Sequence, residues 1–97
     1  MPPASRVGDL TAHGTPLGPG PGSVNVLIGG RLAWRAMADF HACPLVSGLV
    51  PHGGGVVPMG SPTVFINNLP AARQGDLVSE ATAPNTITMG DPTVIIG

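Results

Sequence analysis

Three short apolar runs recur along the chain, and each is bounded by residues that favour turns. They are Val26-Leu27-Ile28, Val64-Phe65-Ile66 and Val94-Ile95-Ile96. Each run follows a Gly-Ser or Gly-Asp pair, and the second and third runs are also directly preceded by Pro-Thr. Apolar runs of this length between Gly and Pro are typical of short buried strands. The pattern predicts a mainly β protein of short strands and many turns, with the first strand over residues 23–28.

A second motif accompanies the apolar runs and carries an arginine and an aspartate. The best-preserved copy is Pro70-Ala71-Ala72-Arg73-Gln74-Gly75-Asp76, and Pro3-Ala4-Ser5-Arg6-Val7-Gly8-Asp9 is closely similar. A looser copy with one extra residue is Leu32-Ala33-Trp34-Arg35-Ala36-Met37-Ala38-Asp39. Because a unit this short cannot bury a core by itself, the three copies must pack against one another.

Two further structural expectations follow from the alignment of the copies. Residues 31–39 contain several helix formers, but they align with the extended segment 69–75, so we expect extended structure there. Each Arg/Asp pair is expected to be a local ion pair that caps a turn, rather than a pair of catalytic groups. Residues 77–88 are expected to form strand, loop and strand.

Composition limits the core and the classes of partner. The 97 residues include 15 Gly and 12 Pro but only two Phe and one Trp, so the core must consist of small aliphatic side chains. A net charge of −1 with no lysine leaves no basic patch for nucleic acid. No apolar run approaches the roughly 20 residues that span a bilayer, and the N-terminus lacks the apolar segment of a signal peptide. We expect one domain over residues 1–97, without an effector domain, that is made in the cytoplasm.

The three histidines and the single cysteine are candidate metal ligands. They are His13, His41, Cys43 and His52. On an extended segment, His41 and Cys43 would project from the same face about 7 Å apart. His52 follows in a Gly-rich loop that can fold back, and His13 occupies the repeat position of Cys43. Three imidazoles and one thiolate make a closed tetrahedral zinc site and favour zinc over iron without deciding between them. A lone cysteine is also common as a buried apolar residue, so spacing alone leaves that alternative open.

The longest copy of the repeat resembles the signature of a known family. The run over residues 60–76, with Pro70-Ala71-Ala72-Arg73 in it, is similar to that of the PAAR-repeat family, and the resemblance extends to His41-Ala42-Cys43-Pro44 and His52-Gly53. The resemblance implies a small conical protein of three pseudo-threefold-related β repeats. It also implies one zinc ion near the apex, held by three His and one Cys at positions 13, 41, 43 and 52.

The same resemblance implies a structural function. PAAR-repeat proteins sharpen the spike of contractile injection machines, which include type VI secretion systems, extracellular injection particles and phage tails. One tip would cap one trimeric β-helical spike, formed by VgrG or a phage gp5-like equivalent, and would aid membrane piercing and effector delivery. The tip would be assembled on the spike and expelled into or through the target membrane, and any cargo would be carried by a partner.

Two other functions are compatible with these residues. A zinc-stabilised module that binds other soluble proteins would differ only in its partner. A small zinc hydrolase would need an open position for water and a general base. Glu80, the single glutamate, occupies the repeat position of His13 and Cys43 and could therefore lie near the metal. As a fourth protein ligand it would leave no room for the water, so we expect no enzymatic activity.

Overall fold

The protein is built from short antiparallel strands joined by turns. The computed structural model describes residues 2–44, 46–47, 49–51, 53–80 and 85–97, and no helix occurs within these ranges. The strands are β1 (Pro3–Ala4), β2 (Pro19–Gly20), β3 (Leu27–Ile28), β4 (Arg31–Leu32), β5 (Phe40–His41), β6 (Val46–Ser47), β7 (Val50–Pro51), β8 (Phe65–Ile66), β9 (Leu69–Pro70), β10 (Leu77–Val78), β11 (Asn85–Thr86) and β12 (Asp91–Ile95). The expected mainly β fold is confirmed.

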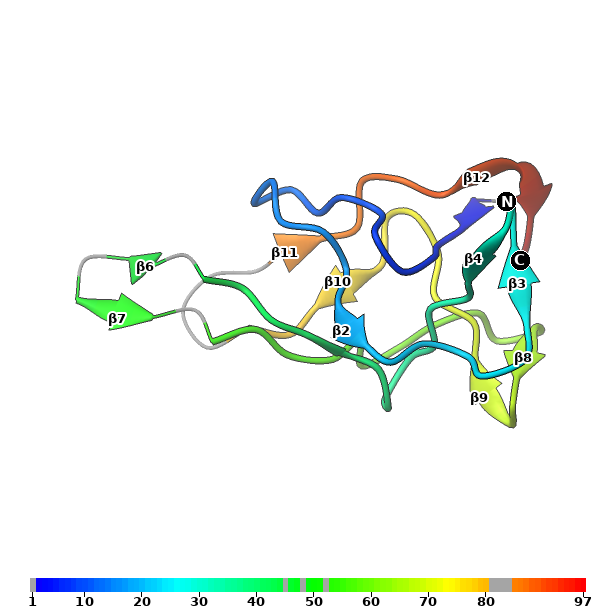
Figure 1. The fold of residues 1–97 in the computed structure, drawn as a ribbon, viewed down its shortest axis with the longest axis horizontal. Coiled ribbons are helices and arrows are strands. Elements are labelled where there is room, and N and C mark those ends of the chain that lie inside the picture. The colour runs from blue at the N-terminus through cyan, green and yellow to red at the C-terminus, as the bar shows by residue number, and fades with distance from the viewer. Residues whose placement is uncertain (1, 45, 48, 52, 81–84) are drawn as a thin grey trace.

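The strands pair two by two, and the wide end of the molecule carries three such pairs. Hairpin β3–β4 turns through Gly29-Gly30, and hairpin β8–β9 turns through Asn67-Asn68. The third pair has the same antiparallel form, but it joins β1 to β12, the two ends of the chain. Figure 1 places all three pairs at one end of the long axis, with the N and C labels side by side.

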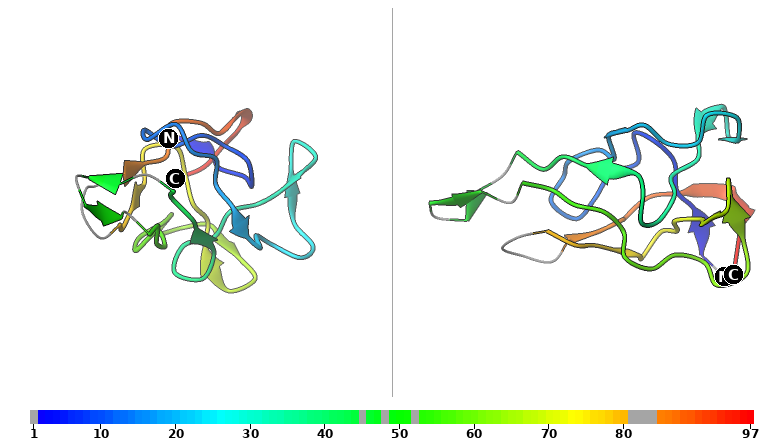
Figure 2. Two further views of the ribbon diagram at one scale, coloured as in Figure 1. Left: turned by 60° about the vertical axis from the view of Figure 1, so that its left-hand side comes forward. Right: turned by 90° about the horizontal axis from the view of Figure 1, so that it is seen from below.

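The molecule tapers from these three pairs toward a single hairpin. It measures 38 × 23 × 22 Å along its principal axes. Strands β2, β10 and β11 lie near the middle of the long axis, and hairpin β6–β7 projects at the opposite, narrow end (Figure 1). The view from below in Figure 2 shows the same projection. The outline agrees with the conical shape expected from the sequence.

A closed ring of backbone hydrogen bonds joins the three copies of the Arg/Asp motif. The amide of Ser5 donates to the carbonyl of Ala72 (3.0 Å), the amide of Ala72 to that of Trp34 (2.9 Å), and the amide of Trp34 to that of Ser5 (3.0 Å). These residues occupy the same position in their respective copies. The copies therefore pack on one another in a cycle, as their small size requires, while a pseudo-threefold axis stays a prediction.

Two apolar clusters lie inside this framework. The first contains one alanine and one isoleucine from each copy, namely Ala4, Ala33, Ala71, Ile28, Ile66 and Ile96, flanked by Val26, Val64 and Val94. The second contains Leu17, Trp34, Ala36, Val57, Ala72, Val78 and Ile87. The interior is mainly aliphatic, as expected, but the fully buried Trp34 also belongs to it, so the expectation of a core without aromatic residues was wrong.

The strand predicted over residues 23–28 is shorter in the structure. Only Leu27–Ile28 pairs as β3, whereas residues 23–28 were expected to be extended. The hydroxyl of Ser23 accepts hydrogen bonds from the backbone amides of Asn25 (3.3 Å) and Val26 (2.9 Å). A serine that bonds its neighbouring backbone in this way favours a turn over a strand.

The three Arg/Asp corners are local ion pairs, as predicted. The guanidinium-to-carboxylate distances are 3.0 Å for Arg6–Asp9, 2.8 Å for Arg35–Asp39 and 2.8 Å for Arg73–Asp76. Each aspartate also accepts the backbone amide of its own arginine, which closes the turn. The hydrogen bond to Asp9 raises the pKa of Arg6 against the lowering effect of burial.

Residues 31–39 are extended and then turn, which confirms the expectation from the repeat. Strand β4 is followed by isolated bridges at Ala33 and Arg35 and by a turn over residues 36–38. Met37 adopts a φ of 70° at this turn, where the other two copies place Gly8 (φ 92°) and Gly75 (φ 96°). An L-residue is strained in this left-handed conformation by about 1–2 kcal/mol.

Met37→Gly is therefore expected to stabilise the protein by about 0.5–1 kcal/mol, because relief of strain exceeds the backbone entropy that glycine loses. Met37 is 54% exposed, so little packing is lost. Urea denaturation would measure the change. Ala38→Gly in the same turn is the matched control, since Ala38 does not have a positive φ, and it should destabilise. Equal destabilisation by both changes would contradict the strain argument.

Candidate metal centre

Three potential ligands come together from the three copies of the repeat. His13, Cys43 and Glu80 each lie four residues after the aspartate of an Arg/Asp corner. His13 lies in the turn after the first corner, Cys43 follows β5, and Glu80 follows β10. Their ligand atoms all lie within 4.8 Å of one another. The repeat alignment therefore predicted correctly that Glu80 lies beside His13 and Cys43.

The distances within this group fit a tetrahedral metal site. Nδ1 of His13 lies 3.7 Å from Sγ of Cys43 and 3.3 Å from Oε1 of Glu80. Zinc bonds of about 2.0–2.3 Å to N, O and S, at tetrahedral angles, separate neighbouring ligand atoms by about 3.3–3.6 Å. Imidazole, thiolate and carboxylate are all zinc ligands. The residues present therefore fit a zinc ion in both chemistry and spacing.

The electrostatics of the group also favour a cation. The side chain of Glu80 is fully buried, and Cys43 is buried as well. A thiolate and a carboxylate held together away from water are costly unless a positive charge lies between them. A divalent cation would offset that cost and cross-link three segments that are distant in sequence.

His41 lies next to this group rather than within it. Its Nε2 lies 3.1 Å from the hydroxyl of Thr15 and 3.8 Å from Oε2 of Glu80. Burial lowers the pKa of His41, against the opposite effects of the Glu80 carboxylate and the Pro16 carbonyl. Because the unfolded chain takes up a proton more readily at this ring, its contribution to stability decreases as the pH falls below about 6.5. His52 lies outside the described residues, so its role as a ligand stays a prediction.

Two polar residues that sequence reasoning missed support the group. Asn85 is fully buried, and its side-chain oxygen accepts the backbone amides of His13 (3.1 Å) and Thr86 (2.9 Å). Its Nδ2 donates to Oε2 of Glu80 (2.7 Å). Thr15 supports His41 through its hydroxyl, which lies 3.1 Å from Nε2 of that ring. Nothing in the sequence neighbourhood of Asn85 indicates contact with residue 13.

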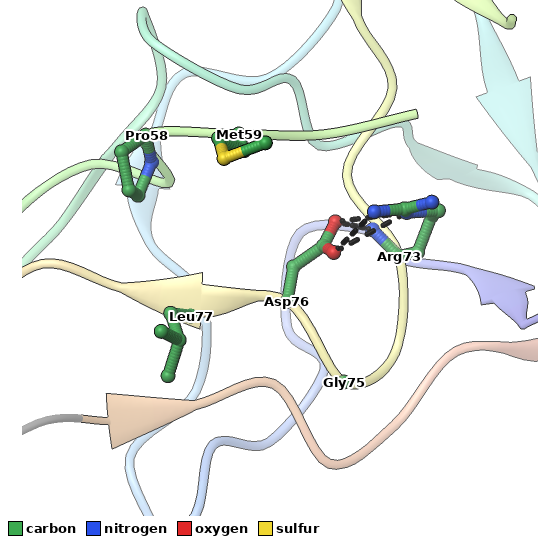
Figure 3. A pocket seen from close by; sticks show the side chains of 6 residues that line it. All are labelled: Pro58, Met59, Arg73, Gly75, Asp76 and Leu77. Atoms are coloured by element: carbon green, nitrogen blue, oxygen red, sulfur yellow. Dashed lines mark hydrogen bonds and ion pairs between the residues drawn. The ribbon is translucent and has the colours of Figure 1, made fainter. Parts of the chain in front are cut away.

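A pocket of about 260 Å³ lies apart from the donor group. Its lining consists of Pro58, Met59, Arg73, Gly75, Asp76 and Leu77. Figure 3 shows the charged pair at its edge, where the arginine and the aspartate are bonded to each other. Because these two groups are already paired and no donor-group residue contributes to the lining, we assign no chemistry to this pocket.

The wide end presents a second candidate surface, which is apolar. Each of the three copies exposes the central residue of its apolar run there: Leu27 is 61% exposed, Phe65 59% and Ile95 46%. The residue that follows each of them is buried in the first apolar cluster. Exposed apolar side chains on strands that lie at one end of the molecule are compatible with an interaction site there.

Fold and site together define a small β protein of packed repeats with a metal-type donor group at their junction. The family model of the PAAR motif matches residues 7–79 and 47–97, and the chain belongs to this family. It is a spike-tip protein of the PAAR type, which is a structural class. No curated protein matches the chain. In the part of the chain that the structure describes, no helix is long and apolar enough to cross a membrane.

Proposed function

We propose that this chain is the structural tip that caps the trimeric, VgrG-like spike of a contractile injection machine. The wide end would sit on the spike, and the narrow end would lead into the target membrane. The observation that carries this proposal is the set of three exposed apolar residues at the wide end, Leu27, Phe65 and Ile95. Exposed apolar patches on soluble proteins mark surfaces that a partner covers.

The number of these side chains matches a threefold partner. Each copy of the repeat contributes one of them, from β3, β8 and β12, and these strands lie at the same end in Figure 1. The cyclic hydrogen bonds among Ser5, Trp34 and Ala72 support an arrangement of the copies around one axis. One chain could then present three similar contacts to three identical spike subunits.

The metal in this proposal is one structural zinc ion. His13 and Cys43 are the proposed ligands that the structure describes together, and His41 and His52 complete the set predicted from the sequence. When bound, zinc would supply a cross-link between the copies at their junction. A hydrolase would need its glutamate as a base beside metal-bound water. The placement of Glu80 within the donor group supports a closed structural site and no enzymatic activity.

The proposal includes a place of action. The tip would be made in the cytoplasm, assembled on the spike and expelled with it. Effector cargo would be carried by a partner of the tip. A module that binds another soluble protein through the same apolar face is the alternative, and the experiment below distinguishes the two.

Native mass spectrometry of the chain mixed with its candidate spike trimer tests the capping function. We expect one chain, three spike subunits and one zinc ion. Leu27→Glu should weaken capping at least about tenfold, because about 1.5–3 kcal/mol of apolar burial is lost and a charge is placed at the interface. Leu77→Glu is the matched control, since Leu77 is 55% exposed but lies on β10, away from the wide end.

The control variant should cap as well as the unmodified chain. Equal weakening by the two substitutions would overturn the assignment of the wide end. A folded, metal-bound chain that forms no complex with the spike trimer of its own machine would overturn capping and favour the binding-module alternative.

A further inference from the structure

We propose that Glu80 is a direct ligand of the metal and that His41 acts behind it as a positioning residue. This inference rests on the metal centre of the proposed function and is independent of docking to the spike. It changes the donor set implied by the family, which consists of three His and one Cys, by placing the carboxylate of Glu80 in the set instead of the imidazole of His41.

Two ligand-type atoms converge on one ring nitrogen of His13. Oε1 of Glu80 and Sγ of Cys43 lie 3.3 and 3.7 Å from the same Nδ1 of His13. That nitrogen carries either one hydrogen or one lone pair, which would have to serve both contacts. A metal ion among the three atoms would bond to each of them separately, at the ligand-to-ligand spacing of a tetrahedral site.

The two carboxylate oxygens of Glu80 have different partners. Oε2 accepts a hydrogen bond from Nδ2 of Asn85 at 2.7 Å, so it is held by the protein. Oε1 is the oxygen that points to His13. An amide that holds one oxygen of a carboxylate and orients the other toward the metal is a common arrangement behind metal ligands. Asn85 also fixes the backbone of His13, so one buried side chain positions two ligands.

His41 faces the carboxylate oxygen of Glu80 that Asn85 holds. Nε2 of His41 lies 3.8 Å from Oε2, the oxygen held by Asn85, and 3.1 Å from the hydroxyl of Thr15. His41 is fully buried, which restricts its ring to this environment. It therefore lies behind the carboxylate, on the side that Asn85 holds, rather than among the atoms of His13, Cys43 and Glu80 that converge.

Zinc affinity and cobalt spectra of two matched variants of the full chain test this assignment. Glu80→Gln keeps the shape of the side chain but removes its charge, and it should lower zinc affinity more than about 100-fold in competition with a chromophoric chelator. His41→Gln should lower it by about 10–100-fold, the usual effect of a residue that supports a ligand. In the Co²⁺-loaded proteins, Glu80→Gln should change the ligand-field absorption bands, and His41→Gln should leave them in place.

A measurement on the unmodified chain avoids any effect of substitution on folding. Glu80 is the single glutamate, so labelling glutamate with ¹³C gives one side-chain carboxylate resonance. Addition of zinc should shift that resonance.

The metal-free Glu80→Gln chain should melt no lower than the metal-free unmodified chain. A carboxylate with a purely structural role would instead stabilise both the metal-free and the metal-bound protein.

The outcomes separate this inference from the capping proposal. Zinc binding that is unaffected by Glu80→Gln, with an unshifted carboxylate resonance, would overturn the role of Glu80 alone. A larger effect of His41→Gln on both affinity and cobalt bands would make His41 the ligand and would also overturn it. An unmodified chain that binds no zinc but still forms the complex with the spike would remove the metal centre and leave capping in place.

Discussion

Cys43→Ser is expected to lower the melting temperature of the zinc-bound protein by at least about 20 °C. Structural zinc contributes on the order of 10 kcal/mol to folding, and for a chain of this size each kcal/mol corresponds to about 4–8 °C. Loss of only about 4 kcal/mol of that contribution would produce the shift. Cys43 is 5% exposed, and serine is nearly isosteric with cysteine, so a large effect would report on the metal rather than on packing.

Thermal unfolding followed by circular dichroism, with and without a chelator, would measure this effect. The chelator should lower the melting temperature of the unmodified chain to that of Cys43→Ser, and it should have little further effect on the variant. A chelator-resistant chain, or a variant that melts within a few degrees of the unmodified protein, would show that the two apolar clusters suffice without a metal.

Asp9→Ala is expected to destabilise the protein by about 3–5 kcal/mol, the cost of removing one partner from a buried ion pair. Asp9 is fully buried and accepts hydrogen bonds from Nε (3.1 Å) and Nη2 (3.0 Å) of Arg6 and from Nη2 of Arg31 (2.9 Å). Its removal leaves the Arg6 guanidinium, which is 10% exposed, with the 3.4 Å contact to Asp91 as its remaining ion pair.

Asp76→Ala provides the comparison for this prediction. Asp76 pairs with Arg73, which is 21% exposed and therefore better solvated when its partner is lost. The loss at Asp76 should be about half that at Asp9, because solvent screens the remaining charge. Urea denaturation of both variants would measure the two losses. Equal losses in the free energy of unfolding would mean that the burial of the arginine does not determine how strongly the substitution destabilises the protein.

Asp91 is the second acidic residue that contacts Arg6, after Asp9. Hydrogen bonds from Thr93 lower the pKa of Asp91, and the charges of Arg6 and Arg31 lower it further. Asp91 therefore remains ionised to a lower pH than an ordinary aspartate does, and it continues to attract Arg6 there. The stabilisation that it contributes is present at neutral pH and is lost only in stronger acid.

The repeats made much of this fold predictable from the sequence. Aligned copies located the strands of the three apolar runs, the Arg/Asp corners and the extended course of residues 31–39, because the same local pattern recurs in each copy. They also placed Glu80 beside His13 and Cys43, since equivalent positions in packed repeats converge. The length of β3 was overestimated because the hydroxyl of Ser23 competes for the backbone hydrogen bonds of the turn.

The supporting contacts of the candidate site were not predictable in the same way. Asn85 bonds the backbone of His13 across 72 positions, and Thr15 meets His41 across 26. No periodicity relates these residues, and each belongs to a stretch that interrupts the repeat. Their contacts are set by how the irregular segments pack, which a pattern of apolar and polar positions does not record.

The pairing of β1 with β12 gives the chain a topology close to that of a closed loop. Two hairpins at the wide end are continuous, through Gly29-Gly30 and Asn67-Asn68. The third pair is antiparallel as well, but its register shifts between Pro3 and Ala4 and no turn connects its two strands. The backbone hydrogen bonds among Ser5, Trp34 and Ala72 also connect each copy of the Arg/Asp motif to the other two. A circular permutant with its present ends joined and a new opening at either intact turn would retain the same contacts, so the order of the copies along the chain is incidental to the fold.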